Sequence, residues 1–226
     1  MFKSWYVAII GRPNTGKSTF LNAFLDAKVS IISPKPQTTW RTIKGIYTES
    51  RGQIIFLDAP GMHQSEEAVN VAINDRAKRS AQEADVILHF IDSSRNIGEE
   101  DELVRIFVGT LLKPVIRVYT KSDVGLFSIP QDAIAISSIK KEWFEPLIEK
   151  IFEHLPEWPQ YYDDEYYTDQ TVGERVEEIV REKIYQTFSD EIPYGILVEL
   201  AHHEINDTDM KLLVYISTEK ESVKPI

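Results

Sequence analysis

The feature that most constrains this chain is the segment GRPNTGKS at residues 11–18. It matches the phosphate-loop pattern, and it lies between an apolar run at 5–10 and apolar residues at helical spacing. Such a turn from strand to helix lets backbone amides and the helix dipole face a phosphate group. A chance glycine turn is the alternative interpretation. The residues expected to contact a nucleotide here are Gly11, Arg12, Pro13, Asn14, Thr15, Gly16, Lys17, Ser18 and Thr19.

Short β-rich runs alternate with helical patterns along the first two thirds of the chain. The runs lie at 5–10, 54–57, 86–91, 115–119 and 133–136, and the helical patterns at 66–82, 99–111 and 142–154. This order predicts an α/β fold with a doubly wound, mostly parallel sheet whose ligands bind at the carboxyl ends of the strands. Only about ten residues separate the segment at 120–123 from the run at 133–136, where a parallel crossover normally takes a dozen or more, so we expect no full helix there.

The last third of the chain predicts a second, smaller domain. Two prolines and four tyrosines among acids, in PEWPQYYDDEYYTDQ, indicate a linker at 157–170 after a first domain at 1–156. A helical pattern begins at Thr171, and apolar runs at 196–201 and 212–216 flank a polar connector, as in a hairpin with an extended loop. We therefore expect an incomplete α+β domain at 171–226.

Composition narrows the class of protein. The chain has no Cys, which excludes disulfides and thiolate-bound metals. The first residues enter a strand-like run directly, and no apolar run approaches the roughly 20 residues of a membrane span. We expect a cytoplasmic protein, for which peripheral membrane contact stays open. Residues 1–156 hold equal numbers of basic and acidic residues, so the whole net charge of −11 falls in 157–226.

Two further segments match the switch regions that surround a bound triphosphate. DAPG at 58–61 follows an apolar run, so Asp58 is expected to organise Mg²⁺ and Gly61 to offer its amide to the γ-phosphate. Alone, an Asp before a Pro-Gly turn is often structural. In PQTTWRT at 36–42, Thr39 is the candidate for Mg²⁺ and the γ-phosphate, with Thr38 as its rival; exposed threonines before a strand are the structural alternative.

A fourth segment, TKSD at 120–123, predicts recognition of guanine. The Asp123 carboxylate can accept both the ring N–H and the exocyclic amine, an arrangement that adenine cannot reproduce. Lys121 would pack its stem along the base, with Thr120 beside it. Ser137 and Ser138, after the run at 133–136, would place a backbone amide near the guanine carbonyl oxygen. An ordinary polar loop is the alternative at either place.

With these motifs in this order, the chain resembles the translation-factor-like GTPases and, more closely, the Era family, over essentially its whole length. The stretch KPQTTWRTIKGI resembles that family's first switch, IIFLDAPGMH its second, and VREKIYQTFSDEIPYG the entry to its C-terminal KH domain. The resemblance implies binding and hydrolysis of GTP with Mg²⁺. It also implies a role in assembling the small ribosomal subunit through contact with the 3′ region of its RNA. The catalytic residues would be Lys17, Thr39 and Gly61, and the metal ligands Ser18, Thr39 and Asp58.

The chain also departs from the family pattern. Thr120 replaces an Asn whose amide ties the base to the phosphate loop, so we expect weaker guanine affinity. No GXXG loop, the RNA clamp of KH domains, occurs in 171–226, and this part is acidic. We therefore expect a shortened KH-like domain with weak or absent RNA binding.

Residues next to Gly61 and in the phosphate loop bear on the rate of GTP hydrolysis. Met62 stands where some GTPases have a water-orienting Gln, so we expect slow hydrolysis; the alternative is that Met62 simply fills a gap. His63 is expected at a mobile surface. Asn14 resembles an asparagine that helps to hold K⁺ in some related GTPases.

Three rival interpretations remain at this stage. The chain could be another GTPase of the same superclass that acts on tRNA or the ribosome. It could be a binding module that switches loop order with the nucleotide and scarcely hydrolyses it. A phosphate-loop ATPase requires that Asp123 does not recognise guanine.

Overall fold

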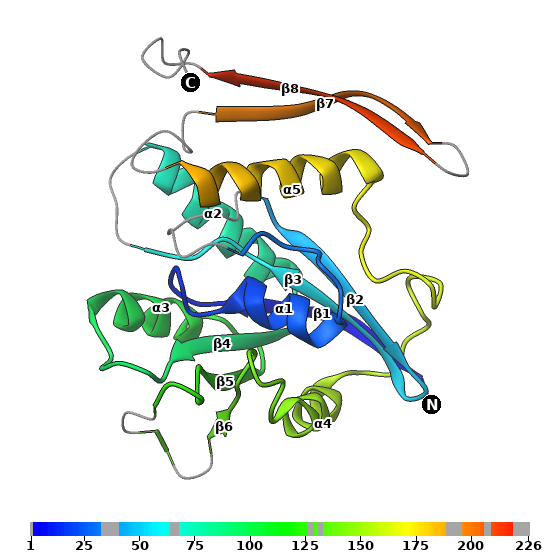
Figure 1. Cartoon of the computed structure of the whole chain (residues 1–226). Helices are drawn as coiled ribbons and strands as arrows, with labels where there is room; N and C mark the ends of the chain where they lie inside the picture. The colour runs from blue at the N-terminus through cyan, green and yellow to red at the C-terminus, as the bar shows by residue number, and fades with distance from the viewer. Residues whose placement is uncertain are drawn as a thin grey trace. The chain divides into compact units, whose positions relative to one another are not determined.

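The computed structural model describes residues 2–32, 41–63, 68–125, 129–130, 133–188, 196–205 and 209–218 (Figure 1). The chain divides into two compact units. The first comprises Met1–Ser30 with Thr39–Asp169, and the second Ile31–Thr38 with Gln170–Ile226. Thr38 and Thr39, the candidates in the first switch, lie outside the described residues.

The first unit is built on a six-stranded sheet in the order β2-β3-β1-β4-β5-β6. Its strands are β1 (Lys3–Ile10), β2 (Ile43–Glu49), β3 (Gly52–Asp58), β4 (Val86–Asp92), β5 (Val115–Thr120) and β6 (Ile134–Ala135), and its helices are α1 (Lys17–Leu25), α2 (Ala68–Glu83), α3 (Glu99–Gly109) and α4 (Phe144–His154). All neighbouring strands pair in parallel except β2 and β3. The predicted mostly parallel α/β fold is confirmed.

Helices cover both faces of this sheet (Figure 1). Along β1, Val7 and Ile9 pack in a core with side chains of α1 and α4, whereas Ala8 and Ile10 pack in a second core with side chains of α2 and α3. A strand buried on both faces needs an unbroken apolar run, which is what residues 5–10 provide. Within the described ranges, no helix combines the length and the apolar character needed to cross a membrane.

Strand β2 was not among the strands that the sequence patterns single out. It pairs antiparallel with β3, and Gly45 lies in its middle. A Cβ atom at Gly45 would lie 2.5 Å from Leu21 Cδ1 and 2.7 Å from Leu25 Cδ1, so any larger residue there would displace these leucine side chains of helix α1. A glycine inside a strand weakens the sequence signal, because it offers no side chain to pack.

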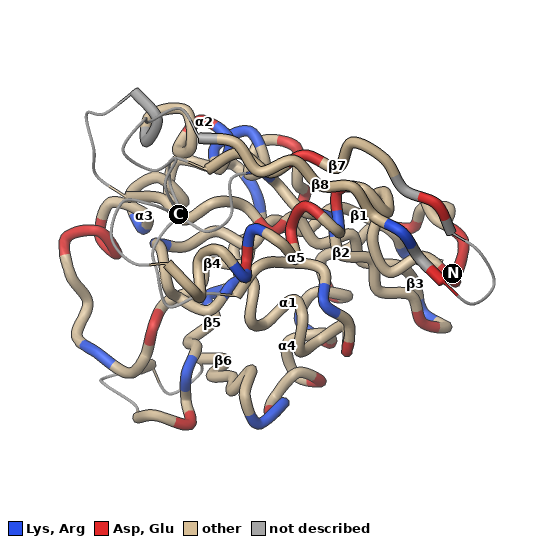
Figure 2. The backbone as a smooth tube through the Cα atoms, turned by 45° about the horizontal axis from the view of Figure 1, so that its top comes forward, with Lys and Arg blue, Asp and Glu red and all other residues tan. Residues whose placement is uncertain are grey.

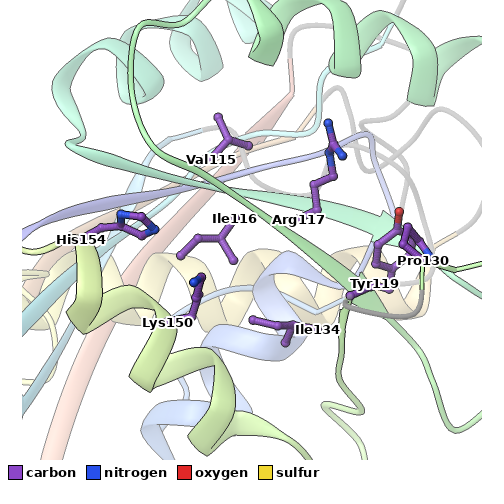
Figure 3. A pocket seen from close by; sticks show the side chains of 9 residues that line it. Val115, Ile116, Arg117, Tyr119, Pro130, Ile134, Lys150 and His154 are labelled. Carbon is purple, nitrogen blue, oxygen red and sulfur yellow. The ribbon is translucent and has the colours of Figure 1, made fainter.

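The connection from β5 to β6 is short, as predicted. The two strands pair in parallel through Val118 and Tyr119, and the described residues between them form no helix. Beside this connection lies a groove of about 390 Å³ (Figure 3). It is lined by Val115, Ile116, Arg117, Tyr119, Pro130, Ala133 and Ile134, and by Lys150 and His154 of α4. Its lining includes Tyr119, next to Thr120, but no residue of the phosphate loop or of 120–123, so this groove is separate from the predicted nucleotide site.

The segment expected to be a linker runs along the first unit as far as Asp169. The buried side chain of Gln53 accepts hydrogen bonds of 3.0 Å from the amides of Tyr161 and Tyr162, and it donates one of 2.8 Å to the Tyr162 carbonyl. The Ile46 amide donates to the Tyr167 carbonyl at 2.9 Å. These bonds attach 157–169 to the sheet, and the position of a domain boundary near 156 or 171 stays a prediction.

The second unit contains helix α5 (Val172–Thr187) and the antiparallel strands β7 (Ile196–Ile205) and β8 (Met210–Thr218). Thr171 and Glu174 form a capping box that starts α5, as the predicted helix start requires. The Leu200 amide donates to Glu177 of α5 at 3.1 Å. The strands run further into the polar connector than predicted, with an irregularity between Leu200 and His202, because cross-strand pairing continues through the histidines.

Candidate functional site

The candidate site lies where the parallel strands β1, β3, β4 and β5 end. Their carboxyl ends meet at one edge of the sheet, since the pairs β1–β3, β1–β4 and β4–β5 all run the same way. The residues at this edge are Gly11, Asp58, Asp92 and Thr120. The fold thus brings three of the predicted motifs together and adds one carboxylate that sequence analysis had not selected.

The phosphate loop joins β1 to α1 with a strained backbone that small residues permit. Gly16 has φ +86°, in the left-handed region, and precedes the first helical residue; its carbonyl accepts the Phe20 amide at 2.8 Å. A Cβ atom at Gly11 would lie 2.7 Å from the Phe90 carbonyl oxygen. Both glycines are therefore required, the first for close approach to β4 and the second for the turn into α1.

The ammonium group of Lys17 is buried within the loop. Its Nζ donates to the carbonyls of Arg12 at 2.9 Å and Gly11 at 3.3 Å, and the residue is only 6% exposed. Burial lowers the pKa of Lys17 to about 8, with a further lowering from the Arg12 charge that the Asp58 carboxylate opposes. Lys17 is thus a cation held at the loop's centre, and an anion bound there would restore its usual pKa.

Asp58 sits fully buried at the end of β3. Its Oδ2 accepts hydrogen bonds from the hydroxyls of Ser18 at 2.7 Å and Ser30 at 2.8 Å. Burial raises the pKa of Asp58, although Lys17 and these hydroxyls act in the opposite direction. Sequence analysis did not select Ser30, because no local pattern links it to Asp58.

The pair of Ser18 and Asp58 fits a magnesium ion. The second carboxylate oxygen of Asp58 is buried and has no hydrogen-bond partner, which is costly unless something binds it. Mg²⁺ is commonly held by one or two protein oxygens together with phosphate oxygens and water. The described residues include no cluster of three or more His, Cys, Asp or Glu that could hold a metal by itself. A metal here would therefore depend on the phosphates as well.

The start of the predicted second switch packs directly on the phosphate loop. A Cβ atom at Gly61 would lie 2.5 Å from the backbone nitrogen of Pro13, and the Met62 amide donates to the Gly11 carbonyl at 3.1 Å. The Met62 side chain is buried in the core with α2 and α3, so the gap-filling interpretation describes its position. His63 is half-buried, and its backbone is held on both sides by Asn74.

Thr120 supplies the connection that the sequence analysis expected to be lost. Its hydroxyl donates to the carbonyl of Thr15, in the phosphate loop, at 2.7 Å, and the residue is 1% exposed. A hydroxyl in this position therefore bonds to the phosphate loop in place of the expected amide, and the weaker guanine affinity stays a prediction.

The carboxylate of Asp123 is oriented by the second predicted guanine-binding segment. The hydroxyl of Ser137 donates to Asp123 Oδ1 at 2.7 Å, whereas the Ser137 amide donates to the Glu142 carbonyl at 3.3 Å. Ser137 thus positions Asp123 through its side chain instead of offering its amide to the base. Ser138, half-buried and next in the chain, keeps the predicted amide role as a proposal.

The Arg12 side chain is held by carboxylates. Its guanidinium contacts Asp92 at 3.1 Å and Asp101 at 3.0 Å, so only its backbone is left to face a ligand. Asp92 could have been selected from the sequence, since it follows the apolar run at 86–91. Asp101 gave no such signal. Thr19 is half-buried in the first turn of α1, and Asn14 is exposed with φ +61°.

Comparison with known proteins agrees with this geometry. The model of the family described as 50S ribosome-binding GTPase matches residues 6–121. The chain is 39% identical over 238 residues to GTPase Era of Borreliella burgdorferi, covering 99% of this chain and 82% of that protein. The chain belongs to the Era family of GTPases. The resemblance inferred from the motifs is confirmed, and with it the activity of GTP hydrolysis.

Solved structures of Era show the same fold. A variant from Aquifex aeolicus bound to GDP and AlF₄⁻ superposes with a TM-score of 0.90 at 33% identity, covering 99% of this chain and 82% of that one. Era in complex with MgGDPNP and nucleotides 1506–1542 of 16S ribosomal RNA gives a TM-score of 0.90 at 33% identity, covering 100% and 82%. The likeness to Era extends through both units of the chain.

Affinity for GDP should fall as the pH rises above 8. Bound phosphates favour the charged form of Lys17, whose pKa in the free protein is about 8, so binding above this pH takes up a proton. We expect the dissociation constant, measured by calorimetry, to rise by up to about tenfold per pH unit. Lys17→Arg, which stays charged, should bind GDP more weakly, but its dissociation constant should not show this rise with pH. Equal slopes in the two proteins would show that Lys17 does not titrate.

Proposed function

We propose that this chain is a guanine-nucleotide switch that uses Mg²⁺, works in the cytoplasm and helps to assemble the small ribosomal subunit by contacting its RNA. The observation that carries the proposal is the grouping of a cation, a magnesium-type oxygen pair and an oriented carboxylate at one sheet edge. These are Lys17, the pair of Ser18 and Asp58, and Asp123. Other GTPases of this superclass would share these three features, and the match to Era through 170–226 favours the ribosomal role.

In the proposed complex the phosphates lie in the loop at 11–18. Its amides and Lys17 neutralise phosphate charge, and Gly61 offers an amide to the γ-phosphate. Mg²⁺ would be held by Ser18 and Asp58, with Thr39 as the proposed ligand from the first switch. When bound, the ion neutralises charge that develops on the phosphates. The Era structures with MgGDPNP and with GDP and AlF₄⁻ support this assignment.

The base would be recognised by Asp123. The hydroxyl of Ser137 occupies Oδ1 of this carboxylate and fixes its direction, so the carboxylate is already oriented before it meets the base. Thr120 joins this segment to the phosphate loop through Thr15. Base and phosphates would therefore be held at a set distance from each other.

Hydrolysis is proposed to be slow without a partner. The side chain of Met62 is buried in the core and carries no group that could orient water. A K⁺ ion held near Asn14 is our proposed source of additional positive charge, in place of an arginine finger. The buried Met62 also favours the second candidate, a switch whose output is a change of loop order with little turnover.

Contact with ribosomal RNA is assigned to the second unit. Acidic and basic residues alternate along α5 (Figure 2), and acidic residues predominate in 157–226. Because phosphate contacts supply most nucleic-acid affinity, we propose weak binding of free RNA and tighter binding to the assembled subunit. The RNA contact rests on the Era structure that contains a 16S fragment.

Titration with GTP, ATP and XTP tests base selection. We expect GTP to bind at least about 100-fold more tightly than ATP, since a buried polar group left unpaired is strongly penalised. Asp123→Asn should reverse the preference toward XTP, because the amide matches the extra carbonyl. Ser122→Asn, a change at a neighbouring loop residue, is the control. No measurable affinity of the wild type for any guanine nucleotide with Mg²⁺ would overturn the proposed function.

Comparing GTP turnover in K⁺ and in Na⁺ tests the proposed role of K⁺. We expect K⁺ to raise single-turnover GTP hydrolysis by roughly tenfold or more, because added positive charge stabilises the transition state. Asn14→Ala should reduce the rate in K⁺ to the rate in Na⁺ and leave the latter unchanged. Equal wild-type rates in the two salts remove the potassium role and leave the rest of the site intact.

RNA binding is tested with a fragment matching nucleotides 1506–1542 of 16S ribosomal RNA, the segment present in the Era complex. With a non-hydrolysable GTP analogue, we expect weak binding whose dependence on salt is shallow, since few phosphates are neutralised. A scrambled RNA of equal length is the control. Binding neither to the fragment nor to small ribosomal subunits would contradict the ribosomal role without affecting the nucleotide titrations.

A further inference from the structure

The buried carboxylate of Asp92 forms ion pairs with basic side chains from both ends of the proposed nucleotide site. Asp92, at the end of β4, is 6% exposed. Its Oδ2 contacts the guanidinium of Arg12 at 3.1 Å and the ammonium of Lys121 at 2.8 Å. Arg12 belongs to the phosphate loop and Lys121 to the base-recognition segment, so the two motifs share a single counterion.

The remaining oxygen of Asp92 is also held. Oδ1 accepts the Ser94 amide at 3.0 Å and the Ser94 hydroxyl at 2.6 Å. Burial would raise the pKa of Asp92, but the hydrogen bonds from Lys121 and Ser94 outweigh it and hold the pKa below its usual range. The carboxylate is therefore charged at neutral pH and fixed in direction, with both oxygens occupied.

Arg12 carries this order into the phosphate loop. Besides Asp92, its guanidinium contacts Asp101 of α3 at 3.0 Å and donates to the Pro13 carbonyl at 2.9 Å. Asp101 is anchored separately, by Arg95 at 2.9 Å and the Gly98 amide at 3.0 Å. Asp101 thus supports Arg12, but among the described residues it forms no hydrogen bond or ion pair with Lys121, which makes it a natural control for Asp92.

Lys121 needs an anchor more than an ordinary surface lysine does. Its backbone has φ +61°, unusual for a residue with a side chain, and its side chain is about one third exposed. A lysine stem has large rotamer freedom, which must be lost when the stem packs along a base. Contact with Asp92 removes part of that freedom beforehand and aligns the stem with the loop that Arg12 supports.

We propose that Asp92 is a positioning residue that couples the phosphate loop to the base-recognition segment, so that base and phosphate contacts strengthen each other. The proposal deepens the proposed function and rests on it. Because buried ion pairs contribute little net stability on average, a coupling role gives a physical reason for this charged cluster beyond folding. Coupling also makes a prediction that simple structural support does not: the effects of changing Asp92 and Lys121 should overlap.

A double-mutant cycle on nucleotide release tests the coupling. The rate of release of a fluorescent GDP analogue is measured for the wild type, Asp92→Asn, Lys121→Met and the double variant. We expect each single change to accelerate release on the order of tenfold and the double variant to release no more than about twice as fast as the faster single variant. Asp101→Asn, combined with Lys121→Met, should instead show effects that multiply.

Thermal unfolding of every variant is followed in parallel. If Asp92→Asn does not fold, Ser94→Ala replaces it in the cycle, because it removes the hydroxyl bond to Oδ1 and keeps both the amide bond and the charge of the carboxylate. A severalfold acceleration that vanishes in the Lys121→Met background supports the proposal. If the wild type binds GDP but the accelerations caused by Asp92→Asn and Lys121→Met multiply in the double variant, this inference alone is overturned. Failure of the wild type to bind GDP overturns the proposed function as well.

Discussion

The parallel pairing of β1, β3, β4 and β5 is the constraint on which the rest of the structure depends. It delivers the ends of four apolar strands to one edge, where the backbone and side chains must satisfy their polar groups. Asp58 shows the consequence most clearly, since it is fully buried, held by two hydroxyls through one oxygen and unpartnered at the other. The buried carboxylate oxygen without a hydrogen-bond partner makes this edge suited to a cation that also binds phosphates.

Close backbone approach joins the parts of this edge. The phosphate loop lies against β4 at Gly11 and against the second switch at Gly61, where a single added carbon would collide with backbone atoms. Thr120 hydrogen bonds to Thr15 from a third direction. In the proposed complex, loss of the γ-phosphate would act first at Gly61, which is the kind of discrete contact that a two-state switch requires.

Charged residues are used differently in the two parts of the chain. In the first unit, basic and acidic residues meet in buried pairs, as at Arg12 with Asp92 and Asp101. Such pairs fix geometry more than they stabilise the fold. The net negative charge lies in 157–226, and part of that stretch packs along the first unit through Gln53. The acidic residues therefore belong to a packed segment of the first unit as well as to the second unit.

The sequence by itself determined the phosphate loop, the alternation of strands and helices and the guanine-recognition segment, because each depends on neighbouring residues and their periodicity. It also indicated the short connection before β6. The tertiary structure alone decided that Thr120 reaches Thr15, that Ser137 orients Asp123 and that Ser30 and Asp92 belong to the site. These partners lie on separate strands and loops, so strand order and register bring them together, and neither quantity is written in a local pattern. The same reason explains why the sequence gives no clear strand signal for β2: the glycine at its centre, Gly45, packs closely against Leu21 and Leu25 of α1, a contact between distant segments.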